Sequence, residues 1–122
     1  MKVLIVDDDE MVRTVCSGML KLLQHDVVAV NGGEAAIRTL QSADTEFDLI
    51  MLDELMPGMS GPQTMQQLNG LGFKVPVILC SGQEITVEEF AGSNEVRPSA
   101  VLGKPFTIQR LKSAIAAALA PR

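Results

Sequence analysis

The chain has 122 residues, of which 47% are hydrophobic and 3% aromatic, and its formal net charge is −5. This length suits one domain, 1–122, with an aliphatic core that buries roughly two-thirds of the unfolded surface. The acidic balance argues against direct binding of nucleic acid, because a phosphate backbone is bound by a basic surface. No apolar run approaches the roughly 20 residues of a membrane span, so we expect no membrane contact and a cytoplasmic location.

Apolar periodicity changes repeatedly along the first half of the chain, from runs typical of buried strands to helical spacing. A strand is predicted at Val3–Val6, followed by a helix with Asp9 as its N-cap. A second strand is predicted at Asp26–Val30, and a helical face follows the turn at 31–33. The pattern returns to strand at Phe47–Asp53.

The second half continues this alternation and completes the fold prediction. Expected elements are a helix at Gly61–Leu71, a strand at Val75–Cys80, a weakly marked helix at Thr86–Ala91, a strand at Ala100–Leu102 and a last helix capped by Thr107. Because parallel strands need crossovers, the alternation indicates an α/β fold with a single doubly wound, five-stranded parallel sheet and helices on both faces. The flavodoxin-like strand order 2-1-3-4-5 then places the third strand at the centre.

Polar side chains follow four of the apolar runs, at the point where each strand ends. Asp7 and Asp8 follow the first run, Asp53 closes the third, and Ser81 and Lys104 follow the fourth and fifth. The carboxyl ends of neighbouring parallel strands form the crevice where open α/β sheets bind ligands. A cluster of acids beside one cation and one hydroxyl suits a divalent metal and a phosphoryl group.

Each of these residues also has a purely structural explanation. A carboxylate such as Asp53 can attack phosphorus when the phosphoryl charge is neutralised, but it is also a polar end to a strand. The carboxylates of Asp7 and Asp8 suit Mg²⁺, but the acidic triplet that they form with Asp9 is equally typical of a solvated helix start. Lys104 fits either a phosphoryl ligand or an ordinary salt bridge, and Ser81 either a hydrogen-bond donor or a turn former.

Together, four motifs give the chain a resemblance to the receiver domain of two-component response regulators, the CheY-like family, over essentially its whole length. The motifs are Val-Leu-Ile-Val-Asp7-Asp8-Asp9, Asp53-Glu-Leu-Met-Pro57-Gly-Met-Ser-Gly61, Cys-Ser81-Gly and Lys104-Pro105-Phe106. The resemblance implies that Asp53 is the phosphoacceptor and that Ser81 and Lys104 bind the phosphoryl group. It also implies that the bond between Lys104 and Pro105 is often cis.

The resemblance further implies a metal site and a signalling function. Mg²⁺ or Mn²⁺ would be held by Asp8 with Asp7 assisting, by Asp53, and by the backbone carbonyl of Leu55. A histidine kinase or histidine phosphotransfer protein would donate the phosphoryl group, and the modified surface would bind an output protein or domain. The domain would catalyse only its own phosphorylation and dephosphorylation, so it is not a conventional enzyme. The resemblance leaves open whether the domain forms a weak homodimer.

One position departs from the family pattern. Three residues before Lys104 the family usually has a ring that swings inward on phosphorylation, and here that residue is Val101. Because this side chain is too short for such a swing, we expect the response to lie mainly in residues 81–91.

Two other functions fit the same fold. A phosphohydrolase of the haloacid-dehalogenase type also uses an aspartate after a strand, but it generally carries a second Asp two residues later, where this chain has Leu55. A flavin-binding module is disfavoured because the chain has no Tyr or Trp to stack on the cofactor. Met1 directly before the first strand suits a natural N-terminus, whereas the end at Arg122 fits both a natural end and a boundary before an effector domain.

Overall fold

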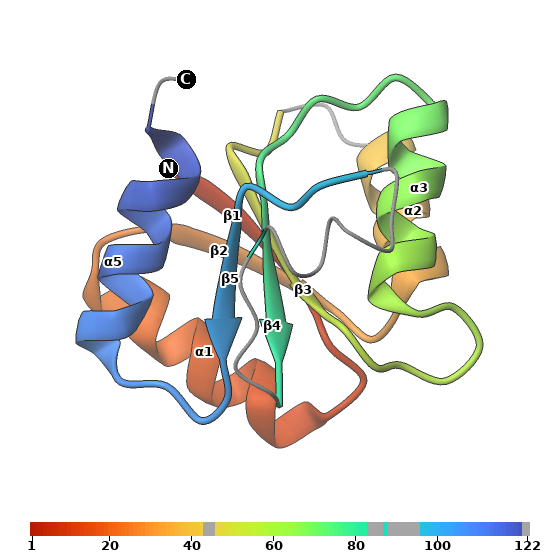
Figure 1. Ribbon diagram of the computed structural model, residues 1–122. Helices are drawn as coiled ribbons and strands as arrows, with labels where there is room; N and C mark the ends of the chain where they lie inside the picture. Colours follow the sequence, from red (N-terminus) through yellow and green to blue (C-terminus); the bar gives the residue numbers. More distant parts are fainter. Residues whose placement is uncertain (43–45, 83–86, 88–95, 121–122) are drawn as a thin grey trace.

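The computed structural model describes residues 1–42, 46–82, 87 and 96–120. Five strands form one sheet in the order β2-β1-β3-β4-β5, and every neighbouring pair is parallel (Figure 1). Their bounds are β1 (Lys2–Val6), β2 (Asp26–Val30), β3 (Leu49–Asp53), β4 (Val77–Ser81) and β5 (Ala100–Gly103). The predicted α/β class and the predicted strand order are confirmed.

Helices cover both faces of this sheet, as the sequence predicts. They are α1 (Glu10–Leu22), α2 (Gly33–Ser42), α3 (Gly61–Gly70) and α5 (Ile108–Leu119). Helices α1 and α5 pack on one face and α2 and α3 on the other (Figure 1). The helix expected at 86–91 lies outside the described residues, except for Val87.

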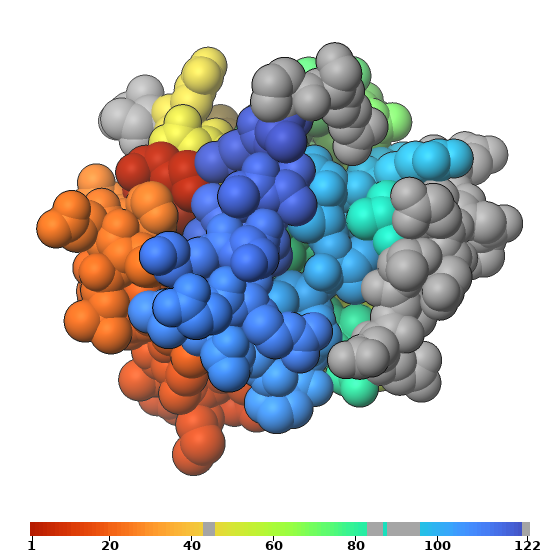
Figure 2. All heavy atoms as spheres, turned by 60° about the vertical axis from the view of Figure 1, so that its left-hand side comes forward, coloured from red at the N-terminus to blue at the C-terminus, as the bar shows by residue number. Residues whose placement is uncertain are grey.

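The sheet is apolar on both faces, which explains why its strands have continuous apolar runs rather than an alternating pattern. In β1, Val3 and Ile5 belong to the core beneath α1 and α5, whereas Leu4 and Val6 belong to the core beneath α2 and α3. Every residue of β3 is buried, so β3 is the centre of the sheet in burial as well as in order. Figure 2 shows α5 in dark blue across the middle of one face of the molecule.

Both predicted helix caps are present. Asp9 accepts a hydrogen bond from the backbone nitrogen of Met11 at 2.9 Å, and Thr107 accepts one from Arg110 at 3.2 Å. The structure adds a capping box at the start of α3, where Ser60 and Gln63 each accept from the other's backbone nitrogen. These caps fix the points at which α1, α3 and α5 leave the loops that follow the strands.

Two strands begin two residues later than the sequence predicts, whereas β1 begins one residue earlier and β4 and β5 end one residue later. Strand β4 begins at Val77 instead of Val75, because Pro76 has no N–H to donate to the sheet, although its carbonyl accepts from Ile50 at 2.9 Å. Strand β3 begins at Leu49 instead of Phe47. Among the described residues, no helix is both long and apolar enough to cross a membrane.

Candidate functional site

The polar residues predicted to gather lie at the carboxyl edge of the sheet, which is the lower edge in Figure 1. Asp7 follows β1, Asp53 ends β3, Ser81 ends β4, and Lys104 follows β5. One carboxylate oxygen from each of Asp7, Asp8 and Asp53 lies within 4.8 Å of the others. Three carboxylates from two adjacent strands therefore meet in one place, as expected from parallel pairing.

Lys104 joins two of these carboxylates. Its Nζ atom donates to Asp53 Oδ1 at 2.7 Å and to Asp7 Oδ2 at 2.9 Å. The side chains of Asp7 and Asp53 are 5% and 10% exposed and that of Lys104 is 24% exposed, so the ion pairs are partly shielded from water. One ammonium thus connects the ends of β1, β3 and β5 and offsets part of the negative charge of the cluster.

Burial and charge act in opposite directions on these groups. Burial raises the pKa of Asp53, and the hydrogen bond and charge of Lys104 lower it only in part, while Asp7 and Asp8 raise it further. Burial alone lowers the pKa of Lys104, but its contacts with Asp53 and Asp7 outweigh this effect, and the pKa is raised overall. Lys104 is therefore a permanent cation, whereas ionised Asp53 carries a desolvation cost.

The backbone around Asp7 is held by α1. The other carboxylate oxygen of Asp7, Oδ1, accepts from the backbone nitrogen of Asp9 at 2.9 Å, and Arg13 donates to the carbonyl of Asp7 at 2.8 Å. Asp8, between them, is exposed. The buried Asp7 is thus engaged on both oxygens, while Asp8 is open to solvent beside it. A hard cation with oxygen ligands fits this set of donors.

Ser81 is fully buried, and its hydroxyl donates to Glu54 Oε1 at 2.8 Å. No role was predicted for Glu54 from the sequence, although its position directly after Asp53 is a signal that could have identified it. A second residue without an assignment is Arg13, whose contact with a carbonyl has no sequence signature. The phosphoryl-binding role of Ser81 stays a prediction.

The β3–α3 loop returns directly to the site. The nitrogen of Gly61 donates to the carbonyl of Glu54 at 2.9 Å, which closes the Pro/Gly-rich loop between them. Within this loop Gly58 has a φ of +82°, a conformation that L side chains rarely adopt. The side chain of Leu55 is 76% exposed, and the metal-ligand role of its carbonyl stays a prediction.

Ser81 and Lys104 are also connected through the backbone. The nitrogen of Lys104 donates to the carbonyl of Ser81 at 2.7 Å, one step beyond the pairing of Ser81 with Gly103. The peptide bond between Lys104 and Pro105 is cis, as the family resemblance implies.

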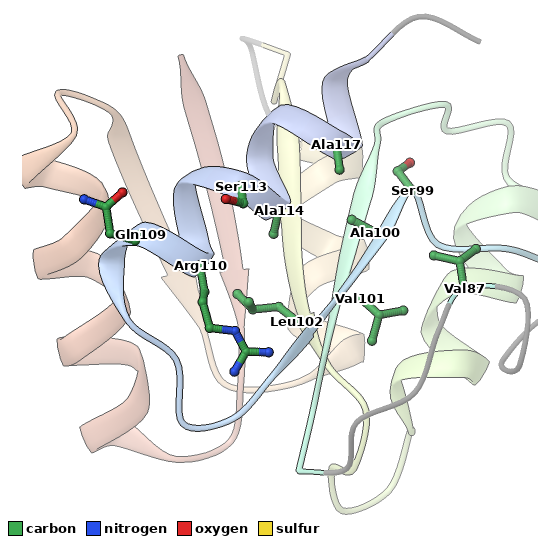
Figure 3. Close-up of a pocket in the computed structure, with 10 residues that line it drawn as sticks. All are labelled: Val87, Ser99, Ala100, Val101, Leu102, Gln109, Arg110, Ser113, Ala114 and Ala117. Carbon is green, nitrogen blue, oxygen red and sulfur yellow. The ribbon is translucent and has the colours of Figure 1, made fainter.

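Val101 lies on β5 beside an open hollow. The hollow has a volume of about 560 Å³, and most of its lining comes from β5 and α5, including Ala100, Arg110 and Ala114 (Figure 3). Val101 is only partly buried there. Its short side chain is one of those that line this hollow.

Comparisons with known proteins agree with this geometry. A family model described as the response regulator receiver domain matches residues 3–116. The two-component response regulator ARR14 of Arabidopsis thaliana is 30% identical over 113 residues, which cover 93% of this chain and 29% of that protein. The 3',5'-cyclic-nucleotide phosphodiesterase regA of Dictyostelium discoideum is 28% identical over 116 residues, which cover 93% of this chain and 15% of that protein.

The chain therefore spans less than a third of the length of these two curated relatives. Among solved structures, the chemotaxis protein CheY4 of Vibrio cholerae is 26% identical, with a TM-score of 0.82 over 97% of this chain and 98% of that one.

Proposed function

The chain belongs to the response regulator receiver domain family, a family of two-component signalling, and we propose that Asp53 is its phosphoacceptor. The donor is a histidine kinase or a histidine phosphotransfer protein, and the phosphorylated surface binds an output protein or domain. The observation that carries this proposal is the position of Asp53, which is 8% exposed at the end of the central strand and lies 2.7 Å from the Lys104 ammonium.

The transfer exchanges one bond for another. Lys104 holds Oδ1 of Asp53, so we expect Oδ2 to attack phosphorus. An Oδ–P bond forms while the bond between phosphorus and the donor's imidazole nitrogen breaks, and its electron pair stays on that nitrogen. The Lys104 ammonium then donates to a phosphoryl oxygen, where it offsets charge that develops during transfer. Ser81 supplies a second donor to the same group.

A divalent cation, Mg²⁺ or Mn²⁺, completes this site in our proposal. Asp8 and Asp53 are the carboxylates that would hold it, with Asp7 assisting and the carbonyl of Leu55 adding an oxygen. The exposed position of Asp8 supports its leading role, because both oxygens of Asp7 already have partners. When bound, the cation neutralises phosphoryl oxygens and so permits a negatively charged group to enter an acidic crevice.

An apolar groove beside the site supports docking of the donor at α1. The groove has a volume of about 340 Å³ and is lined by α1 and by the loop after β5, including Met11, Val15, Phe106 and Lys104 itself. Met11 and Val15 are 75% and 51% exposed. A donor that contacts this groove would be close to Asp53, because Lys104 borders both. The free thiols of Cys16 and Cys80 fit the cytoplasmic setting of such donors.

Phosphorylation with a small donor tests the assignment. The protein is incubated with acetyl phosphate and Mg²⁺, and its intact mass is measured. We expect the addition of one hydroxylamine-labile phosphoryl group, no addition in Asp53→Asn, and normal addition in Asp26→Asn, which removes an exposed carboxylate at the opposite edge of the sheet. Equal modification of Asp53→Asn and the parent would show that another residue is the phosphoacceptor.

A further inference from the structure

The hydrogen bond between Ser81 and Glu54 occupies the hydroxyl that is expected to bind the phosphoryl group. A serine hydroxyl has one proton to donate. In this structure the Ser81 proton is directed to Glu54 Oε1 at 2.8 Å. While that contact persists, the same proton is not available to a phosphoryl oxygen on Asp53.

Glu54 is held in place by the backbone on both sides. Its nitrogen donates to the carbonyl of Cys80 at 2.9 Å, and its carbonyl accepts from Gly61 at 2.9 Å. The first contact extends the pairing of β3 with β4 by one residue, so Glu54 faces the end of the strand that carries Ser81. Its side chain is only partly exposed. These two backbone contacts therefore hold Glu54 at the position from which its carboxylate accepts the hydrogen bond of Ser81.

We propose that Glu54 is a positioning residue that keeps the hydroxyl of Ser81 away from the phosphoryl group until Asp53 is phosphorylated. This proposal rests on the proposed function of Asp53. A phosphoryl group brings a charge of roughly −2 next to the Glu54 carboxylate, and repulsion favours separation of the two. The hydroxyl of Ser81 then exchanges one anionic acceptor for another.

This exchange has two consequences of opposite sign. The contact stabilises the unphosphorylated, metal-free protein, because a hydrogen bond to a charged acceptor is among the stronger ones in proteins. The same contact must be broken when Ser81 engages the phosphoryl group, so it weakens binding of a phosphoryl analogue. A residue with only a structural role would not strengthen analogue binding when it is removed.

A double-mutant cycle on beryllofluoride binding tests the proposal. Affinity in the presence of Mg²⁺ is measured by calorimetry for the parent, Glu54→Ala, Ser81→Ala and the double variant. We expect Glu54→Ala to strengthen binding about tenfold in the parent, the scale of one charged hydrogen bond, and less than about threefold in the Ser81→Ala background. An equal effect in both backgrounds would show that Glu54 acts through its charge alone and would overturn the proposal.

Two further variants separate the hydrogen bond from the charge. Glu54→Gln keeps an oxygen that can accept from Ser81, so we expect an affinity between those of the parent and Glu54→Ala. Glu34→Ala removes an acid that lines the hollow next to Asp8, and we expect less than a threefold change. If Glu34→Ala and Glu54→Ala strengthen binding equally, the effect is general electrostatics and Glu54 has no positioning role.

A measurement without metal or analogue gives an independent check. Urea unfolding of the same four cycle proteins in a chelator measures the coupling between Glu54 and Ser81, and we expect Glu54→Ala to unfold at lower urea only when Ser81 is present. Absence of coupling would contradict the proposal. Mass spectrometry of the beryllofluoride-free proteins with acetyl phosphate distinguishes a failure of the proposed function, in which no variant is modified at Asp53, from a failure of this inference.

Discussion

Gly61, the first residue of α3, lies directly against the backbone carbonyl of Asp53, with no space for a side chain between them. A Cβ atom at this position would overlap with that carbonyl oxygen and would lie 3.0 Å from the Cα of Glu54. The contact is between two backbones, so no flexible side chain can move to make room. The start of α3 thereby fixes the end of β3 and the orientation of the carboxylate that it carries.

We therefore expect Gly61→Ala to be costly. The overlap should lower the free energy of unfolding by about 1–3 kcal/mol, the scale of overpacking in a dense interior, and should slow phosphorylation by displacing Asp53. Thermal unfolding and the mass assay measure the two effects. Gly70→Ala is the matched control at the other end of α3, where a Cβ meets open space, and it should be neutral or stabilising by about 0.5–1 kcal/mol. Equal stability of the two variants would contradict the packing argument.

Asp53 should make the metal-free protein less stable at neutral pH. Because burial raises its pKa, the contribution of Asp53 to stability is full below the ordinary pKa of 3.8 and is lost as the pH rises through the higher, folded-state value. In a chelator, Asp53→Asn should therefore be more stable than the parent at pH 7, and the difference should disappear near pH 3. Urea titrations across this range measure it. If the stability that Asp53→Asn gains over the parent did not depend on pH, desolvation of the Asp53 carboxylate would not be its cause.

The neighbouring acids Asp8 and Asp9 should have separate roles. Asp8→Ala should weaken Mg²⁺ binding and suppress phosphorylation, and removal of one of several mutually repelling carboxylates should stabilise the metal-free fold. Asp9→Ala should leave metal binding nearly intact but lower stability by roughly 1 kcal/mol through loss of the cap on α1. Calorimetric titration measures the Mg²⁺ affinity of the two variants, and thermal unfolding measures their stability. Unchanged Mg²⁺ affinity in Asp8→Ala would remove Asp8 from the site.

Both thiols should be unreactive in the folded protein. Burial raises the pKa of Cys16 to about 11 and that of Cys80 to about 12, so neither is a thiolate at pH 8. A colorimetric thiol reagent should titrate no cysteine in the native protein and both in urea. The same shifts predict that stability falls as the pH rises from about 9 towards 11–12, since the unfolded thiols ionise first. Rapid native reaction of either thiol would contradict its burial.

Val101 should contribute little to the phosphorylation response. Its side chain is too short to report the state of Asp53 by rotating between buried and exposed positions. Amide chemical shifts with and without beryllofluoride should change mainly within residues 81–91, and Val101→Ala should leave this pattern largely intact. A response that vanishes in Val101→Ala, while beryllofluoride still binds, would show that Val101 couples the site to the surface.

The fold was predictable because its signals are local and redundant. Continuous apolar runs such as that of β3, separated by capped helical segments, admit few arrangements other than a doubly wound parallel sheet. The gathering of Asp7, Asp53 and Lys104 follows from that topology alone, since each stands at a strand end. The start of β4 was less predictable, because Pro76 has no N–H to donate to the sheet while its carbonyl still accepts a hydrogen bond from Ile50.

The side-chain partners within the site were not predictable in the same way. Which acceptor Ser81 has depends on how the ends of β3 and β4 lie beside each other, where Glu54 donates to the carbonyl of Cys80. The contact of Arg13 with the carbonyl of Asp7 likewise depends on how α1 leaves its cap. No sequence pattern records such arrangements.

The backbone hydrogen bond from Lys104 to Ser81 makes the two expected phosphoryl ligands a single mechanical unit. A partner that binds the chain after β4 and displaces the carbonyl of Ser81 would also displace the backbone of Lys104. Such a partner would shift the backbone of both expected phosphoryl ligands together. By thermodynamic reciprocity, a partner that binds the phosphorylated protein more tightly than the unphosphorylated one favours the phosphorylated form at equilibrium by the same factor, and it need not approach the crevice to do so.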